Sequence, residues 1–70
     1  MTGKEFIRRV RALAKARGLP VRLDKKRGKG SHQTLYLGDR KTIVRNPSDE
    51  LKTGTLAAML RQLGLSRDEI

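Results

Sequence analysis

The chain has 70 residues, 17 Lys and Arg against seven Asp and Glu, a formal net charge of +10 at pH 7, and no cysteine. This length predicts one small domain over residues 1–70, and the lack of cysteine excludes disulfides and thiolate metal sites and favours the cytoplasm. The charge excess indicates a polyanionic partner, first of all nucleic acid. An anionic membrane surface is the competing interpretation, disfavoured because no apolar run approaches the length of a bilayer span and no broad apolar helix face is exposed.

A first helix is predicted from Gly3, because Thr2 followed three positions later by Glu5 is a capping-box pattern. The helix is expected to end at Gly18, which is placed for a C′ position. Apolar residues recur at helical spacing and form the expected core stripe: Phe6, Ile7, Val10, Leu13 and Ala14. Arginines and lysines cover the other sides, and an ordinary solvated helix face is the simplest interpretation of them.

Three strands are predicted after Pro20. Residues 21–25 alternate apolar and polar side chains, and residues 31–37 and 40–44 flank a Gly-Asp pair. A two-residue connection of this kind suits a type II′ turn, so the last two strands should form an antiparallel hairpin.

The register of this hairpin follows from placing Leu37 opposite Arg40. Leu35 then faces Thr42, and one surface carries the better core, formed by Leu35, Leu37 and Val44. The opposite surface carries His32, Thr34 and Tyr36, and in this register His32 faces Arg45.

A second amphipathic helix is predicted near the C-terminus, with Thr53 as its N-cap and Gly64 at its end. Its apolar stripe is Leu56, Met59, Leu60 and Leu63. The polar tail from Ser66 is expected to fray. The element order α-β-β-β-α predicts an α+β fold in which both helices pack on one face of a small three-stranded antiparallel sheet.

His32 is the only histidine and the candidate catalytic residue. The acidic residues have no spacing that would bring carboxylates together around a metal, so neither a metal site nor another cofactor is expected. An imidazole titrates close to neutrality and can take a proton from the 2′-hydroxyl of RNA, whose oxygen then attacks the adjacent phosphorus. The alternative is that His32 is an ordinary surface residue of a strand.

The candidate RNA- and phosphate-binding residues lie in the basic loop, on the hairpin and at the start of the second helix. They are Lys25, Lys26, Arg27, Lys29, Ser31, Tyr36, Lys41, Arg45, Lys52 and Thr53. Tyr36 could stack on a base, although strand tyrosines are also favoured packing residues. Backbone N–H groups from residue 52 onward could bind a phosphate, although most helix starts bind water.

The Gly30-Ser31-His32 motif, the hairpin that follows it and residues 50–66 together resemble the HicA family of toxin ribonucleases from prokaryotic toxin-antitoxin systems. The resemblance implies a fold like a double-stranded RNA-binding domain, mRNA cleavage by His32, and neutralisation by a HicB antitoxin that occludes the site. Many members carry a second histidine where Gln33 stands here, and a further one near the end of the third strand. Their replacement favours a one-histidine mechanism helped by Arg45 or a loop lysine.

Three hypotheses follow for the function. The first is an endoribonuclease toxin that acts on mRNA. The second is a non-catalytic RNA-binding module that holds RNA through shape and phosphate contacts. The third is a protein-interaction partner whose positive surface binds an acidic protein.

Overall fold

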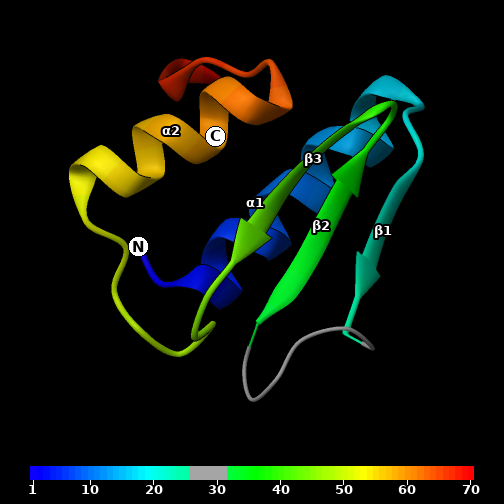
Figure 1. The fold of residues 1–70 in the computed structure, drawn as a ribbon. Helices are drawn as coiled ribbons and strands as arrows, with labels where there is room; N and C mark the ends of the chain where they lie inside the picture. The colour runs from blue at the N-terminus through cyan, green and yellow to red at the C-terminus, as the bar shows by residue number, and fades with distance from the viewer. Residues whose placement is uncertain (26–31) are drawn as a thin grey trace.

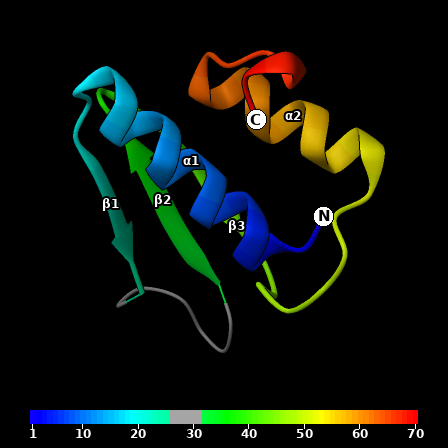
Figure 2. The same cartoon turned by 180° about the vertical axis from the view of Figure 1, so that it is seen from behind.

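The computed structural model describes residues 1–25 and 32–70, and it has the predicted α+β element order. The elements are α1 (Gly3–Arg17), β1 (Val21–Asp24), β2 (Gln33–Leu37), β3 (Arg40–Val44) and α2 (Thr53–Leu63), followed by a short 3-10 turn, η1 (Arg67–Glu69). In Figure 1, α1 lies behind the sheet and α2 lies beside β3. The view from behind shows α1 crossing the front of the sheet, with α2 again on the β3 side (Figure 2).

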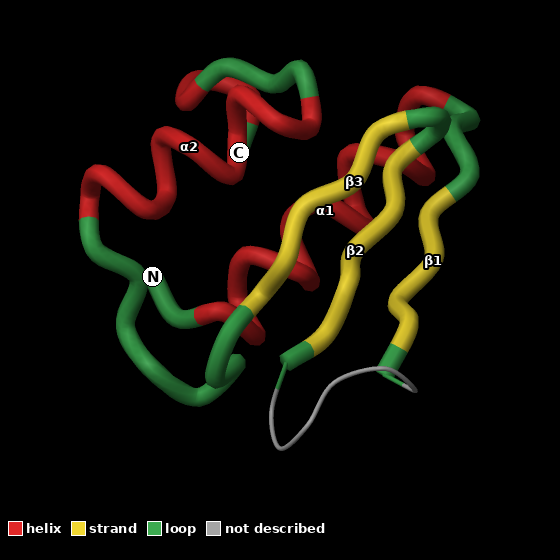
Figure 3. Tube along the Cα trace, in the orientation of Figure 1, coloured by secondary structure: helices red, strands yellow, loops and turns green. Residues whose placement is uncertain are grey.

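The three strands form one antiparallel sheet in the order β1-β2-β3 (Figure 3). The predicted hairpin register is confirmed from Leu37 opposite Arg40 to Gln33 opposite Val44. Gly38 has φ 60°, the positive value that a type II′ turn needs at its first central position. The ladder ends at Gln33, so the predicted pairing of His32 with Arg45 is not part of it. β1 also ends one residue earlier than predicted, at Asp24.

The first helix has the predicted ends. The side chain of Thr2 accepts a hydrogen bond from the backbone N–H of Glu5 at 3.2 Å, and the Glu5 carboxylate accepts one from Arg9 at 2.6 Å. Gly18 terminates the helix with φ 67°, a left-handed conformation that costs glycine little. The predicted stripe is buried except for Leu13, which is partly exposed.

The second helix confirms the predicted stripe and the stop at Gly64, which has φ 72°. The predicted N-cap at Thr53 is wrong by one residue. Lys52 has the extended backbone of a cap, and its carbonyl accepts the first helical hydrogen bond from Leu56 N–H at 2.9 Å. Thr53 is therefore the first helical residue, and the Lys52 side chain makes no capping hydrogen bond.

Both helices and the sheet share one hydrophobic core. Its buried members are Phe6, Ile7, Val10, Ala14, Leu35, Leu37, Val44, Leu56, Met59, Leu60 and Leu63. Thr42 points into this layer with 2% of its surface exposed, and its hydroxyl donates to Gln62 Oε1 at 2.5 Å. Because a buried hydroxyl without a partner is costly, this bond favours α2 in its place alongside β3.

The expected fraying of the tail is wrong. Residues from Ser66 onward form η1, closed by a capping box between Ser66 and Glu69. Arg17 of α1 forms an ion pair with Glu69, and Arg9 donates to the carbonyl of Ile70 at 3.1 Å. Cations of α1 thus hold the tail against the helix.

The segment before α2 is bound to the start of α1 through backbone hydrogen bonds. Lys4 N–H donates to the Pro47 carbonyl at 2.8 Å, and Leu51 N–H donates to the Met1 carbonyl at 2.8 Å. The first of these bonds satisfies a donor that the first turn of α1 would otherwise leave without a partner. Both bonds fix the path of the connection that leads from β3 to α2.

Candidate functional site

His32 lies immediately before β2 and is exposed. The last pair of the hairpin ladder is Gln33 with Val44, so His32 and Arg45 each lie one residue beyond that pair, at the same end of the hairpin. Arg45 is exposed as well. The imidazole of His32 is therefore exposed to solvent outside the core. It lies at the end of the sheet where Arg45 follows β3.

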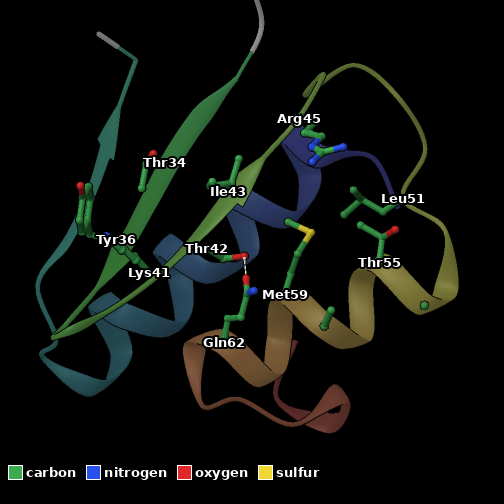
Figure 4. Close-up of a pocket in the computed structure, with 12 residues that line it drawn as sticks. Thr34, Tyr36, Lys41, Thr42, Ile43, Arg45, Leu51, Thr55, Met59 and Gln62 are labelled. Atoms are coloured by element: carbon green, nitrogen blue, oxygen red, sulfur yellow. Dashed lines mark hydrogen bonds between the residues drawn. The ribbon is translucent and has the colours of Figure 1, made fainter. Parts of the chain in front are cut away.

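A groove of about 1090 Å³ runs between the open side of the hairpin and α2 (Figure 4). It is lined by Thr34, Tyr36, Lys41, Thr42, Ile43, Arg45, Leu51, Gly54, Thr55, Ala58, Met59 and Gln62. Three predicted binding residues, Tyr36, Lys41 and Arg45, are thus brought to one surface. Figure 4 shows Arg45 at the end of β3 that faces the beginning of α2.

The groove combines positive charge with apolar surface. Lys41 and Arg45 supply two cations, and none of the described residues that line the groove is acidic. Ile43 is 58% exposed on β3, and Met59 of α2 lies across from it. Sites for single-stranded nucleic acid usually combine cations that bind phosphates with aromatic side chains that stack on bases, and Tyr36 is the aromatic side chain that lines this groove.

Tyr36 is half-buried on the open face of the sheet, opposite Arg22 of β1 and Lys41 of β3. The guanidinium carbon of Arg22 lies 4.3 Å from the centroid of the tyrosine ring, which is a cation–π contact. Tyr36 is absent from the hydrophobic core, which lies on the other side of the sheet. The Tyr36 ring is thus contacted by the Arg22 guanidinium and also lines the groove.

The other predicted binding residues are not gathered in this groove. Lys25 follows β1 and lines a second cavity of about 340 Å³, together with Lys4 of α1. Lys52 and Thr53 are exposed at the start of α2, but the first turn of that helix reaches the groove through Gly54 and Thr55. Four predicted residues lie outside the described part of the chain: Lys26, Arg27, Lys29 and Ser31.

The sequence analysis predicted binding at the start of α2 but missed the contribution of the rest of this helix to the groove. Thr55, Ala58 and Gln62 recur at i, i+3 and i+7, which places them on one side of the helix. These small and polar residues form a second stripe beside the apolar one, and this stripe could have indicated a second functional side of α2. Arg22 was also missed, because its position opposite Tyr36 depends on the β1–β2 register, which the sequence analysis did not predict.

Within residues 1–25 and 32–70, no group of three or more His, Asp or Glu side chains is placed to hold a metal ion. The same ranges contain no helix that is both long enough and apolar enough to cross a bilayer.

A family model for the HicA toxin of bacterial toxin-antitoxin systems matches residues 3–65. The chain belongs to the HicA toxin family. The match confirms the family resemblance seen in the sequence, and it covers both helices and the whole sheet. No curated protein and no solved structure matches this HicA-family chain with significance.

Membership assigns the HicA-family chain a role as the toxin of a toxin-antitoxin pair, and it implies an antitoxin partner. The matched range includes His32, the groove and the cations around it. The chemistry of those residues is therefore the basis for a proposal about how the toxin acts.

Proposed function

We propose that this HicA-family toxin is a metal-independent endoribonuclease that cleaves mRNA, with His32 as its general acid and base. The observation that carries the proposal is the exposure of the only histidine at the end of the hairpin where Arg45 borders the cationic groove. An RNA strand that follows the groove comes within reach of that imidazole.

The proposed reaction uses side chains alone. The neutral imidazole of His32 takes the proton of a 2′-hydroxyl, and the oxygen attacks the adjacent phosphorus. The bond to the 5′-oxygen breaks as the protonated His32 returns the proton to that oxygen, which leaves as a hydroxyl. The product strand ends in a 2′,3′-cyclic phosphate. Arg45 stabilises the charge that develops on the phosphoryl oxygens.

The proposed binding surface extends over the remaining candidate residues. Tyr36 and Lys41 contact the strand within the groove, and Lys52 and Thr53 contact a phosphate at the start of α2. The basic segment that contains Lys25, Lys26, Arg27, Lys29 and Ser31 contributes further contacts to the RNA backbone.

Replacing His32 by alanine tests the catalytic assignment. A general base contributes about 10² to 10⁴ in rate, so His32→Ala should abolish detectable cleavage and growth arrest. Since the side chain is exposed, the thermal unfolding of the variant should match that of the parent. Asp39→Ala, an exposed change at the opposite end of the hairpin, is the control and should retain cleavage. Unaltered cleavage by His32→Ala would show that the assignment is wrong.

We also propose a HicB-type protein as the antitoxin, acting by covering His32 and the groove. The toxin carries 17 cationic against seven anionic side chains, so an acidic surface on the partner would complement it. A stoichiometric amount of the partner should stop cleavage in vitro. Cleavage that continues in the assembled complex would contradict occlusion.

A non-catalytic RNA-binding module is the second candidate. It is favoured by the groove itself, because the described residues that line it do not include His32. Under this alternative, RNA stays bound and intact after long incubation at neutral pH without antitoxin. Cleavage that depends on His32 would exclude it.

A further inference from the structure

We infer that Arg22 and Tyr36 form a stacking subsite for one nucleobase of single-stranded RNA, on the open face of the sheet. The inference rests on the proposed RNA binding and adds the position of a base and the strandedness of the substrate. It assigns Arg22 a positioning role and Tyr36 a direct contact with the base.

The two residues already form two layers of a stack. The guanidinium of Arg22 covers one face of the Tyr36 ring at 4.3 Å from its centroid. Arg22 reaches the ring from β1, whereas the groove lies on the side of β3 and α2. The ring face turned toward the groove is therefore the one that a base can cover. A ring held in place beforehand loses less conformational entropy when the base stacks on it.

The surroundings of this ring suit a nucleotide. Lys41, the cross-strand neighbour of Tyr36 on β3, can bind the phosphate of the stacked nucleotide. Ile43, 58% exposed in the next row of the same face, extends the apolar surface toward Arg45. Neither Ile43 nor Tyr36 belongs to the hydrophobic core formed by the described residues, so core packing does not explain their place on this face.

The distance along β2 sets the position of the base relative to the scissile bond. Tyr36 and Thr34 lie on the open face of β2, and His32 lies two residues before Thr34, just outside the strand. Four residues at no more than about 3.3 Å each separate Tyr36 from His32 by at most about 13 Å. Stacked nucleotides advance about 3.4 Å each, and unstacked ones advance further. The stacked base thus lies at most about four nucleotides from the phosphate at His32.

This subsite selects single strands. In a duplex both faces of each base are stacked on its neighbours, so the ring of Tyr36 has no base face to contact without unstacking. A loop or an unpaired stretch supplies such a face directly. The expected substrate class is therefore unpaired mRNA.

The composition of the chain supplies a reporter for this contact. Tyr36 is the only tyrosine, and the chain has no tryptophan, so intrinsic emission comes from this ring. We would titrate His32→Ala protein, which leaves the RNA intact under the proposed mechanism, with an unstructured RNA oligonucleotide. Stacking of a base on Tyr36 should quench its emission at saturation. RNA binding with unchanged emission would overturn the subsite and leave RNA binding itself standing.

Substitutions then test the contribution to affinity, all in the His32→Ala protein. Tyr36→Phe keeps the ring and should keep the affinity, whereas Tyr36→Leu should weaken binding roughly 5- to 150-fold, the usual effect of losing one stacked base. Arg22→Gln should weaken binding less, because the ring remains. Equal affinity of the Tyr36→Leu and Tyr36→Phe proteins would overturn the proposal.

An abasic scan makes the test independent of any effect of Tyr36→Leu on folding. Single bases are removed in turn from the oligonucleotide, and binding to His32→Ala protein is measured. Affinity should fall for one position within about four nucleotides of the bond that the parent protein cleaves. A uniform response along the strand would overturn the subsite. Quenching by RNA that the parent protein leaves intact would support the subsite while contradicting the nuclease proposal.

Discussion

At Gly3, α1 lies very close to the loop before α2 and to β3. A Cβ built at this position would lie 2.8 Å from Pro47 Cα and 2.9 Å from a side-chain methyl of Val44. The first of these neighbours is backbone, and its loop is held by the hydrogen bond from Lys4 N–H to the Pro47 carbonyl. Any side chain at position 3 must therefore displace either the start of α1 or the loop before α2.

Gly3→Ala should lower the free energy of unfolding by about 1–3 kcal/mol, the usual cost of overpacking a fixed site. Gly54 provides a matched control, because it is also helical but a Cβ there meets nothing within 4 Å. Gly54→Ala should raise stability by about 0.5–1 kcal/mol. Urea unfolding followed by circular dichroism measures both. A Gly3→Ala protein as stable as the Gly54→Ala protein would contradict the tight approach.

Single residues also show what sequence reasoning can reach. The exposure of His32 was predicted from strand alternation, which places position 32 away from the core side of Leu35 and Leu37, although β2 itself begins one residue later, at Gln33. The cation–π contact between Arg22 and Tyr36 was not, because it depends on how β1 aligns with β2 across a long basic connection. Short turns fix a register, whereas long connections leave it open.

At the scale of elements, η1 depends on the ionised form of one carboxylate. The pKa of Glu69 is lowered from its ordinary value of 4.5, first by the hydrogen bond from the backbone N–H of Ser66 and then by Arg17. Both interactions favour the charged form. The Glu69 carboxylate therefore binds both Ser66, at the start of the turn, and Arg17 of α1.

Because this pKa is lower in the folded state, the stabilisation of η1 is fully present above the ordinary value and is lost as pH falls through the lowered one. The amide resonances of Ser66 and Ile70 should therefore shift together at a pH below 4.5. Glu69→Gln should remove this transition and leave the tail less protected from hydrogen exchange at neutral pH. A transition that persists in the Glu69→Gln protein would assign it to another group.

The sequence predicted the hairpin and the buried sides of the helices, but it did not predict where α2 lies relative to the sheet. The hairpin and both helical stripes were predicted from period and turn chemistry, which are local properties. The groove between α2 and the open side of β3 was not, because periodicity shows which side of a helix is buried but not where the helix lies along a sheet edge. The Thr42–Gln62 hydrogen bond is one of the tertiary contacts that favour that position.

At the scale of the whole molecule, the net charge of +10 makes RNA binding depend strongly on salt. Each phosphate contact on a single strand contributes about 0.7 to the slope of log affinity against log salt concentration. Lys41→Gln and Arg45→Gln should therefore each reduce the slope by about 0.7, measured by titration at several salt concentrations.

Arg9 provides the matched control for these cations. Its guanidinium already pairs with Glu5 and with the Ile70 carbonyl on the far side of the molecule, so Arg9→Gln should leave the slope nearly unchanged. Equal reductions for Arg9→Gln and Arg45→Gln would show that RNA senses total charge rather than the groove.

The backbone bonds between the first residues and the segment before α2 bear on how the toxin matures during translation. Backbone groups of Met1, Gly3 and Lys4 bond to Leu51, Asp49 and Pro47, and the core also needs the apolar stripe of α2. Contacts so distant along the chain form late, after the intervening polypeptide has left the ribosome. A nascent chain that extends only as far as β3 thus lacks α2 and the groove, so the toxin cannot acquire the RNA-binding surface proposed for it before α2 has been synthesised.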